Sequence, residues 1–442
     1  MSPMSSMSSY PFAPSHFRTD EACARQLDEA DPLASLRDEF HIPLDKAGQP
    51  VAYLSGNSLG LQPRAARNLI EQELDDWASL AVDAHFDGKT PWYSYHEVFS
   101  DRGARLVGAR TGEVVMMNSL TVNLHLMMVT FYRPTSDRHK IVVEYPSFPS
   151  DTYAVKSQVA HHGYDPADAI ITVEPRDGEH VIREEDIEEL LERRGGEIAL
   201  VMLAGVNFFT GQFIDMARVS AAAKRQGCVV GFDLAHAAGN VPMRLHDWGV
   251  DFAVWCSYKY LNAGPGAIGG CFVNESHGAD LDLPRFAGWW GNEPDKRFLM
   301  HLLPDFVPRA GADGWQISNP PILAMAPLQA SLELFDRAGM DALREKSLKL
   351  IAYMGFLLDE RLGDGVEIIT PTDPAARGCQ WSLLVRDRLK ERLAALQDAG
   401  VVCDFREPNV IRVAPVPLYN SFHDVWRFVE ALAGAPPSAE RA

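Results

Sequence analysis

The chain has 442 residues, of which 46% are hydrophobic and 23% are charged, which is typical of a globular protein with about two or three compact domains. Its formal net charge of −19 opposes binding to nucleic acid and to anionic membranes. No apolar run is long enough to span a bilayer, and the amino terminus lacks a basic segment followed by a hydrophobic one. We therefore expect a cytoplasmic protein that binds neither nucleic acid nor membrane.

The amino-terminal part of the chain is predicted to contain little regular structure. Residues 1–16 are rich in Ser, Met and Pro and almost uncharged, which predicts a disordered tail. Residues 17–64 form an N-terminal segment with a helical pattern over Ala22–Phe40. The cluster of Gly, Asn and Ser in YLSGNSLGLQP, Tyr53–Pro63, predicts a tight loop.

Residues 65–322 alternate between strand and helix patterns, which predicts a large α/β domain with a mostly parallel sheet. The first element is an amphipathic helix over Ala65–Ala84, and one face of it carries Leu69, Leu74, Trp77 and Leu80. At Asn118–Thr121, Ser and Thr are suitable caps for an apolar helix, whose free N–H groups would suit a phosphate. The predicted strands are Lys140–Glu144, Ala169–Val173, Ile198–Ala204, Cys228–Phe232, Asp251–Cys256 and Ala267–Val273. The predicted helices between them are Asp151–His161, Glu184–Arg194 and Met216–Gln226.

After Ser318–Ile322 the pattern changes, and residues 323–434 are predicted to form a smaller C-terminal α+β domain. A long helical stretch covers Leu323–Leu362. The remaining predicted elements are strands near Val366–Thr370, Gln380–Val385, Val401–Asp404 and Val410–Val413, and helices over Arg388–Ala399 and His423–Ala433. Residues 435–442 are predicted to be a frayed tail.

The cysteines show neither a CxxC motif nor metal-ligand spacing: they are Cys23, Cys228, Cys256, Cys271, Cys379 and Cys403. Several lie in apolar, strand-like runs, where a free cysteine behaves as a small hydrophobic residue. We expect reduced core cysteines, no disulfide and no metal site.

Two predicted strands of the large domain end in ionisable residues. One is followed by Asp233 and His236, and the other by Tyr258 and Lys259. Ligands of open α/β sheets bind beyond the carboxyl ends of the strands, so these four side chains are expected to meet. An Asp and a Lys placed in this way are the pair that a pyridoxal 5'-phosphate (PLP) enzyme requires, because the carboxylate pairs with the pyridine nitrogen and the amine forms a Schiff base with the aldehyde. A lone lysine is more often a solvated surface residue.

From about Tyr53 to Phe428 the chain resembles the kynureninase family, which consists of fold type I PLP enzymes. The resemblance rests on these motifs, in this order: YLSGNSLGLQP, NSLTVNLH, FPSD, GFDLAHAAGNVPMRLHDWGVDFAVWCSYKYLNAGPG, GWWG, SNPPI and IRVAPVPLYNSFHD. It implies hydrolytic cleavage of the Cβ–Cγ bond of L-kynurenine or 3-hydroxy-L-kynurenine. The products would be anthranilate or 3-hydroxyanthranilate plus L-alanine, in tryptophan catabolism or in the synthesis of NAD precursors.

The resemblance also implies roles for individual residues. Lys259 would be the Schiff-base lysine, and the Tyr258 hydroxyl would add a donor for the phosphate. As a hypothesis of our own, we assign the catalytic proton transfers at Cγ and Cβ to Tyr258 and ordered water. The implied cofactor-binding residues are Leu120, Thr121, Phe148, Pro149, Ser150, Asp151, Asp233, His236, Tyr258, Lys259, Trp289 and Asn319. Trp289 and Asn319 come from the neighbouring subunit in the family, which implies a homodimer with shared active sites. Arg412 would bind the substrate α-carboxylate, and Ser58 and His85 would line the aryl end of the pocket.

Three positions depart from the family pattern: Ala204 stands where Ser is often found, Phe209 where Tyr is frequent and Asn292 where His is usual. None of them is a catalytic group in this scheme, so we expect activity to be retained. The alternatives are a class V aminotransferase, a cysteine desulfurase-like enzyme and a catalytically silent PLP-binding regulator. A desulfurase needs a nucleophilic cysteine on an exposed loop, whereas the cysteines here mostly lie in apolar strand contexts.

Overall fold

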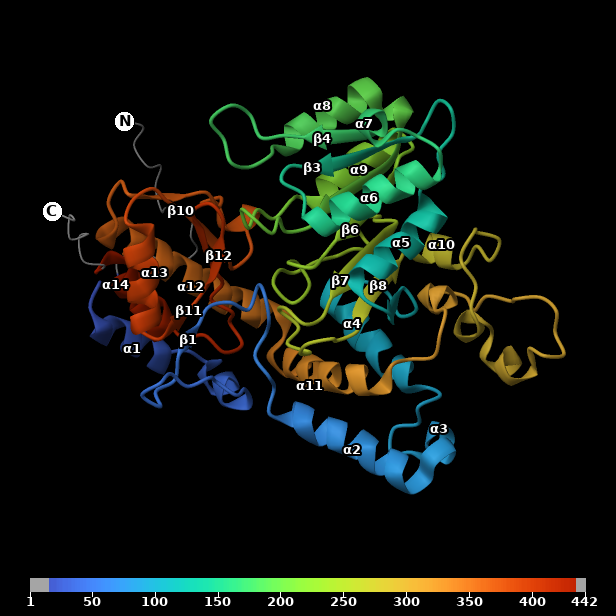
Figure 1. The fold of residues 1–442 in the computed structure, drawn as a ribbon, viewed down its shortest axis with the longest axis horizontal. Coiled ribbons are helices and arrows are strands. Elements are labelled where there is room, and N and C mark those ends of the chain that lie inside the picture. The colour runs from blue at the N-terminus through green and yellow to red at the C-terminus, as the bar shows by residue number, and fades with distance from the viewer. Residues whose placement is uncertain (1–15, 435–442) are drawn as a thin grey trace.

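The computed structural model describes residues 16–434, so the two predicted tails lie outside the described residues except for His16. The fold has a larger α/β part and a smaller part that is built from both ends of the chain (Figure 1). No helix within the described range is both long and apolar enough to cross a membrane. The α-helices are α1 (Glu21–Glu29), α2 (Ala65–Leu80), α3 (Ala84–Asp87), α4 (Ser100–Val107), α5 (Leu120–Phe131), α6 (Pro149–His161), α7 (Pro166–Ala169), α8 (Glu184–Arg194), α9 (Met216–Arg225), α10 (Glu275–Gly278), α11 (Ile322–Ala338), α12 (Met340–Arg361), α13 (Leu389–Asp398) and α14 (Phe422–Ala433).

A seven-stranded sheet forms the centre of the larger part, in the order β2-β8-β7-β6-β5-β3-β4. Its strands are β2 (Val114–Met116), β3 (Lys140–Glu144), β4 (Ile170–Val173), β5 (Ile198–Ala204), β6 (Val229–Asp233), β7 (Phe252–Cys256) and β8 (Gly269–Val273). Strands β7, β6, β5, β3 and β4 are parallel, whereas β8 is antiparallel to both of its neighbours, β7 and β2. The sheet is therefore mostly parallel, and the carboxyl ends of its central strands meet at one edge.

The two faces of this sheet pack against separate hydrophobic cores. On β3, for example, Val142 belongs to one core, while its neighbours Ile141 and Val143 belong to the other. This division follows from the two-residue period of a strand, and it explains why the predicted strands were continuous apolar runs. Helices α5 and α6 cover one face, and α8 and α9 pack together on the other.

The smaller part contains a four-stranded antiparallel sheet in the order β12-β13-β10-β9. Its strands are β9 (Val366–Ile368), β10 (Trp381–Val385), β12 (Asp404–Arg406) and β13 (Val410–Val413). The amino-terminal segment joins this part, because α1 packs on α14 and β1 (Ala52–Tyr53) pairs with β11 (Val401–Val402) (Figure 1). Helix α11 instead packs on α2 and α4, while α12 packs on α14. We therefore propose that the smaller part begins at Gly339, rather than at residue 323, and that it includes residues 17–64.

Several predicted helices are shorter than expected. The pattern over Ala22–Phe40 is broken after Glu29, where Asp31-Pro32 follows, because proline lacks an N–H and disfavours a helical residue before it. The stretch Leu323–Leu362 is two helices separated at Gly339, whose φ is +78°. The predicted strand Val401–Asp404 is likewise divided between β11 and β12, and the short strand β2 was missed.

The apolar face of α2 is not the buried one. Leu74 and Trp77 are 42% and 60% exposed, whereas the buried residues of the helix are Ala66, Glu73 and Asp76. Glu73 accepts a hydrogen bond from the indole N–H of Trp92 at 2.7 Å. The buried carboxylates therefore fix the loop that follows, and the apolar side chains remain on the surface.

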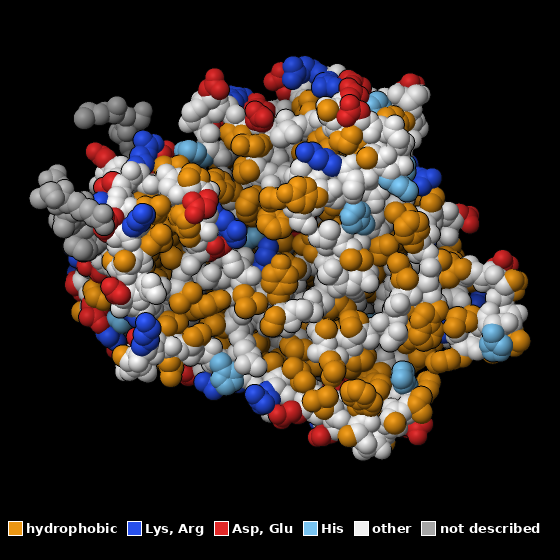
Figure 2. Space-filling model, in the orientation of Figure 1, with side chains coloured by type: hydrophobic (Ala, Val, Ile, Leu, Met, Phe, Trp, Pro, Cys, Tyr) orange, Lys and Arg blue, Asp and Glu red, His pale blue; other side chains and the backbone are white. Residues whose placement is uncertain are grey.

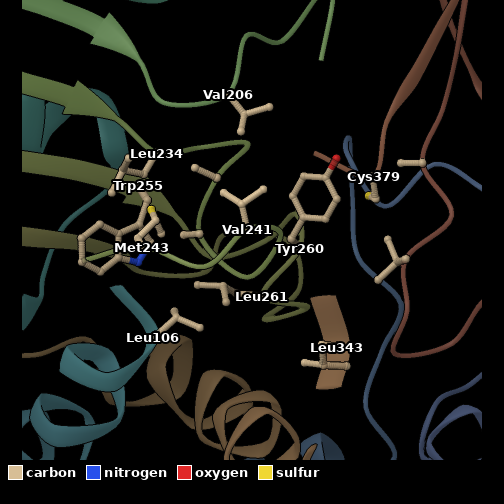
Figure 3. Packing of buried hydrophobic residues seen from close by; sticks show 14 of the residues in the cluster. Leu106, Val206, Leu234, Val241, Met243, Trp255, Tyr260, Leu261, Leu343 and Cys379 are labelled. Atoms are coloured by element: carbon tan, nitrogen blue, oxygen red, sulfur yellow. The ribbon is translucent and has the colours of Figure 1, made fainter. Parts of the chain in front are cut away.

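A continuous core connects the two parts behind the sheet edge. Figure 3 shows buried side chains extending from Leu106 on α4, past Tyr260 and Leu261, to Leu343 and Cys379 of the smaller part. The ring of Tyr260 points toward Cys379 (Figure 3). Because Tyr260 directly follows Lys259, this packing fixes the backbone of the candidate catalytic lysine.

Candidate active site

A cavity at the carboxyl edge of the central strands collects most of the predicted cofactor residues. Asp233 ends β6, and Tyr258 and Lys259 follow β7. The cavity is lined by Leu120, Thr121, Phe148, Ser150, Asp151, Ala204, Val206, Phe208, Asp233, Ala235, His236, Tyr258 and Lys259. Pro149, the first residue of α6, lies between two of these residues in sequence. This is the site that the strand-end pattern predicted.

The amine of Lys259 lies 3.1 Å from Nε2 of His236, and both side chains are buried. Burial, together with the positive charge of Lys259, lowers the pKa of His236 well below its usual value. The imidazole is therefore neutral and can serve as the hydrogen-bond partner of the amine. The Lys259 nitrogen also lies 5.6 Å from the centre of the Phe148 ring and 5.9 Å from that of Tyr258.

Three acidic side chains interact electrostatically at this site: Asp151 and Asp233 line the cavity, and Glu144 lies close enough to affect the pKa of Asp151. Burial, reinforced by the charge of Asp233 and a hydrogen bond to it, raises the pKa of Asp151 well above its usual value. Burial also raises the pKa of Glu144 to about 7, although an N–H from Ala204 at 3.2 Å partly opposes this shift. Asp233 itself accepts the N–H of Ala235 at 2.7 Å. The raised pKa of Asp151 favours its protonated form, which reduces the repulsion between its carboxyl group and Asp233.

The amino termini of α5 and α6 meet on one side of the cavity. The hydroxyl groups of Thr121, in the first turn of α5, and of Ser150, in the first turn of α6, are 3.1 Å apart. The N-cap of α5, Ser119, makes no side-chain capping bond within the described structure, so the first N–H groups of the helix are available. Two hydroxyl groups and two helix starts form a cradle suited to a phosphate.

These residues fit PLP. The cavity offers an amine for the aldehyde, a carboxylate for the ring nitrogen, an aromatic ring at Phe148 and a phosphate cradle. Two buried polar atoms in the cavity wall, Nδ1 of His236 and Oδ1 of Asp151, have no hydrogen-bond partner among residues 16–434. Such unpaired atoms are costly unless a ligand contacts them, which agrees with a site built for a polar group.

Arg412 lies behind one wall of this cavity. Its side chain is only 1% exposed, and its guanidinium donates to the carbonyl oxygen of Phe208, a lining residue. It also forms an ion pair with Asp404, which accepts a 2.6 Å hydrogen bond from the hydroxyl of Ser58. Burial lowers the pKa of Arg412 from its usual value, although Asp404 opposes this shift. The structure thus joins Ser58 and Arg412 through Asp404, next to the cavity but not among its lining residues.

Three predicted site residues lie elsewhere in the chain. His85 and the exposed Asn319 line a second cavity together with Glu73, Trp77, Trp92 and Trp290. The half-buried ring of Trp289 lies 4.7 Å from that of Trp290. His85 contacts the edge of Trp92, with the ring centres 5.4 Å apart. None of the three lines the Lys259 cavity formed by the described residues.

Comparisons with known proteins identify the family. Residues 343–432 match the model for the kynureninase C-terminal domain, and residues 53–386 match that for class-V aminotransferases. A kynureninase of Myxococcus xanthus is 58% identical over 419 residues, covering 95% of this chain and 98% of the relative. One from Koribacter versatilis is 54% identical and covers 94% and 97%.

The chain belongs to the kynureninase family.

It is accordingly a PLP-dependent enzyme of the hydrolase class that acts on carbon–carbon bonds. Two solved structures share its fold at low identity. The Escherichia coli cysteine desulfurase CsdA has a TM-score of 0.73 and 17% identity, covering 91% of this chain and 98% of that one. A C-DES mutant with glycine covalently linked to its PLP cofactor has a TM-score of 0.73 and 15% identity, with coverages of 87% and 97%. Both confirm the predicted fold type I architecture.

Of the three departures from the family pattern, Asn292 has a structural role for its side chain, whereas the contacts at Ala204 and Phe209 are made by backbone atoms. The side chain of Asn292 is buried and accepts the N–H groups of Glu293 and Val307, each at 3.1 Å, which fixes the loop between them. Ala204 lines the cavity and donates its N–H to Glu144. The carbonyl of Phe209 accepts the Ser382 hydroxyl at 2.6 Å.

Three residues near the site were not predicted from the sequence: Glu144, Phe208 and Asp404. Glu144 ends β3 as Asp233 ends β6, so the same signal, an acidic residue after an apolar run, could have found it. Asp404 faces Arg412 across β12 and β13, and this pairing has no local sequence signal. All six cysteines are unpaired; five are buried and Cys403 is half-buried.

Proposed function

We propose that this chain hydrolyses L-kynurenine to anthranilate and L-alanine at the Lys259 cavity, and that it also accepts 3-hydroxy-L-kynurenine. The observation that carries this assignment is the buried Arg412 directly behind Phe208. A guanidinium at the cavity wall can bind the α-carboxylate of an amino acid whose amine replaces Lys259. When bound, PLP supplies the electron sink that stabilises negative charge at the substrate α-carbon.

In this proposal each residue around the cavity has a defined task. Thr121 and Ser150 would hold the phosphate, Phe148 would pack on the ring, and Asp233 would pair with the ring nitrogen. Lys259 would hold the aldehyde, and its free amine would accept the α-proton of the substrate. Neutral His236 adds no second positive charge beside this amine.

Tyr258 is proposed to transfer protons at Cγ and Cβ together with water. Burial, reinforced by the neighbouring Cys256 thiol, raises the pKa of the Tyr258 phenol above its usual value, so the group is a proton donor at neutral pH. Tyr258→Phe should therefore lower kcat far more than it weakens PLP binding. Turnover equal to that of the wild type would remove Tyr258 from the mechanism.

We further propose a homodimer in which each cavity is completed by the partner. The support comes from His85, Trp289 and Asn319, which lie away from the cavity of their own chain. They adjoin a surface rich in exposed apolar side chains, which gather over the α2–α3 region (Figure 2). On α2 and just after it the exposed apolar side chains are Leu74, Trp77, Val82 and Phe86, and within residues 298–303 they are Phe298, Leu299, Met300, Leu302 and Leu303. The two groups meet at Phe86 and Phe298, whose ring centres are 6.1 Å apart. A contiguous exposed patch of this kind is typical of an interface.

Active-site complementation tests this arrangement. Lys259→Ala and Trp289→Ala subunits, each inactive alone, should regain activity when they are mixed and allowed to exchange. Random pairing gives hybrids in half of the dimers, each with one intact site, so about a quarter of the wild-type activity is expected. A mixture that stays inactive, although co-purification of differently tagged subunits shows hybrid dimers, would contradict shared sites.

His85 and Asn319 are polar and can meet a ring hydroxyl from across the interface. His85→Phe should therefore change the ratio of kcat/KM for 3-hydroxy-L-kynurenine to that for L-kynurenine, and an unaltered ratio would refute this role. A transaminase would instead transfer the amino group of kynurenine to an added keto acid such as pyruvate, giving alanine and the keto acid of kynurenine, which an assay with pyruvate would reveal. The cytoplasmic location and the absence of nucleic-acid binding stay predictions from the sequence.

A further inference from the structure

The carboxylate of Asp404 is held by three donors. Its Oδ2 atom accepts the Ser58 hydroxyl at 2.6 Å and a guanidinium N–H of Arg406 at 3.0 Å, and it forms the ion pair with Arg412. Asp404 and Arg412 are directly opposite in the β12–β13 register, and Arg406 lies two residues along β12, on the same face. One carboxylate is thus shared by two arginines.

These contacts occupy the two terminal nitrogens of Arg412, to which the substrate α-carboxylate is proposed to bind. One terminal nitrogen of Arg412 is engaged by Asp404 and the other by the carbonyl of Phe208. Its Nε is buried and has no partner among the described residues. A substrate carboxylate that approaches Arg412 therefore meets a second negative charge, that of Asp404, in a site where burial makes unpaired charges costly.

Arg406 provides the charge that resolves this conflict. Its side chain is 41% exposed, while that of Asp404 is 13% exposed, so Arg406 borders the solvent and can move with little desolvation. Without substrate, one anion is shared by two cations. With substrate, two anions and two cations can form two pairs.

We propose that Asp404 is an exchangeable counter-ion, which pairs with Arg412 in the empty enzyme and is taken over by Arg406 when the substrate α-carboxylate binds Arg412. This proposal rests on the function assigned to Arg412 above. Asp404 and Arg406 are positioning residues, because they act on the substrate through Arg412. The exchange makes the site selective for ligands that carry an α-carboxylate.

A double-mutant cycle tests the exchange, using Arg406→Gln, Asp404→Asn and the double variant. The readouts are KM and kcat for L-kynurenine and, independently of turnover, the Kd of L-alanine from the absorbance of the bound cofactor. Arg386→Gln is the matched control, because Arg386 is an exposed arginine of the smaller part that pairs with Glu367. Decarboxylated kynurenine is the control ligand that lacks the α-carboxylate.

Arg406→Gln should raise KM and the alanine Kd about fivefold, the size expected for a partly exposed charge pair. Asp404→Asn should tighten alanine binding, and in that background Arg406→Gln should have no further effect. Arg386→Gln should change neither KM nor the alanine Kd. The affinity for decarboxylated kynurenine should be the same in the wild type, in both single variants and in the double variant. An Arg406→Gln effect of equal size in both backgrounds, or absent from both, would overturn the exchange.

Two further variants keep the outcome interpretable. If Asp404→Asn does not fold, Arg406→Lys replaces it: lysine should restore most of the affinity that glutamine loses, and an equal loss in both variants would overturn the proposal. Arg412→Met tests carboxylate binding by Arg412 separately from the exchange of Asp404. If this variant binds alanine as well as the wild type does, Arg412 does not bind the carboxylate, and the exchange is wrong as well. If Arg412→Met weakens alanine binding but the cycle shows no coupling between Arg406 and Asp404, only the exchange is wrong.

Discussion

Replacing Glu144 with glutamine is expected to stabilise the cofactor-free protein, and to do so more at alkaline than at acidic pH. Glu144 is buried at the end of β3, and burial raises its pKa from the ordinary value of 4.5 to about 7. A carboxyl group whose pKa is raised on folding stabilises the fold most below its unfolded pKa. That stability is lost as the pH rises from about 4.5 through about 7.

The magnitude follows from the two pKa values. At about 1.36 kcal/mol per pH unit, the whole loss amounts to about 3 kcal/mol, of which about 2 kcal/mol fall above about pH 5.5. Glutamine keeps an oxygen that can accept the N–H of Ala204 but does not ionise. Glu144→Gln should therefore add about 1 kcal/mol to the free energy of unfolding at about pH 5.5 and about 3 kcal/mol at about pH 8.5.

Urea unfolding of the cofactor-free protein at the two pH values measures this difference. Val143→Ala is the control on the same strand, because it removes buried methyl groups and changes no ionisable group, so its cost should be similar at both pH values. If the effect of Glu144→Gln is the same at both pH values, Glu144 does not titrate in this range. The electrostatic account of the carboxylate cluster would then be wrong.

Two further substitutions test the cofactor site. Thr121→Ala removes one of the two hydroxyl groups of the phosphate cradle, so it should weaken PLP binding about tenfold. Binding of pyridoxal, which lacks the phosphate, should not change. An equal loss of affinity for both ligands in a binding titration would contradict this. Gly60→Ala would place its Cβ 2.3 Å from the carbonyl oxygen of Lys259, so it should lower both the melting temperature and the PLP occupancy. Gly196→Ala, whose added carbon has no neighbour within 4 Å, is the control, and identical melting curves for the two variants would refute the close packing at Gly60.

Elements whose signal is local could be predicted from the sequence. Strands β3, β5 and β13 have the predicted bounds, because each is an apolar run with a polar or turn-forming flank. The same logic placed Asp233 and Lys259 at one sheet edge. Breaks inside long helical patterns were missed, because a single residue such as Gly339 interrupts the chain without changing the hydrophobic period.

Features that depend on distant partners could not be predicted. Nothing local in the sequence indicates that Ala52 pairs with Val401, or that Asp404 faces Arg412. The amphipathic pattern of α2 was recognised, but a pattern does not say what covers the apolar face. The sequence did contain the signal for Glu144, since an acidic residue follows an apolar run there as it does at Asp233.

The most direct test of the central claim is a product assay on the purified, PLP-loaded protein. L-kynurenine and 3-hydroxy-L-kynurenine are supplied separately, and anthranilate or 3-hydroxyanthranilate is quantified together with alanine. We expect equal amounts of the aromatic product and alanine, and loss of both in Lys259→Ala. A loaded protein that binds PLP but releases neither product, or a Lys259→Ala variant that retains full turnover, would contradict it.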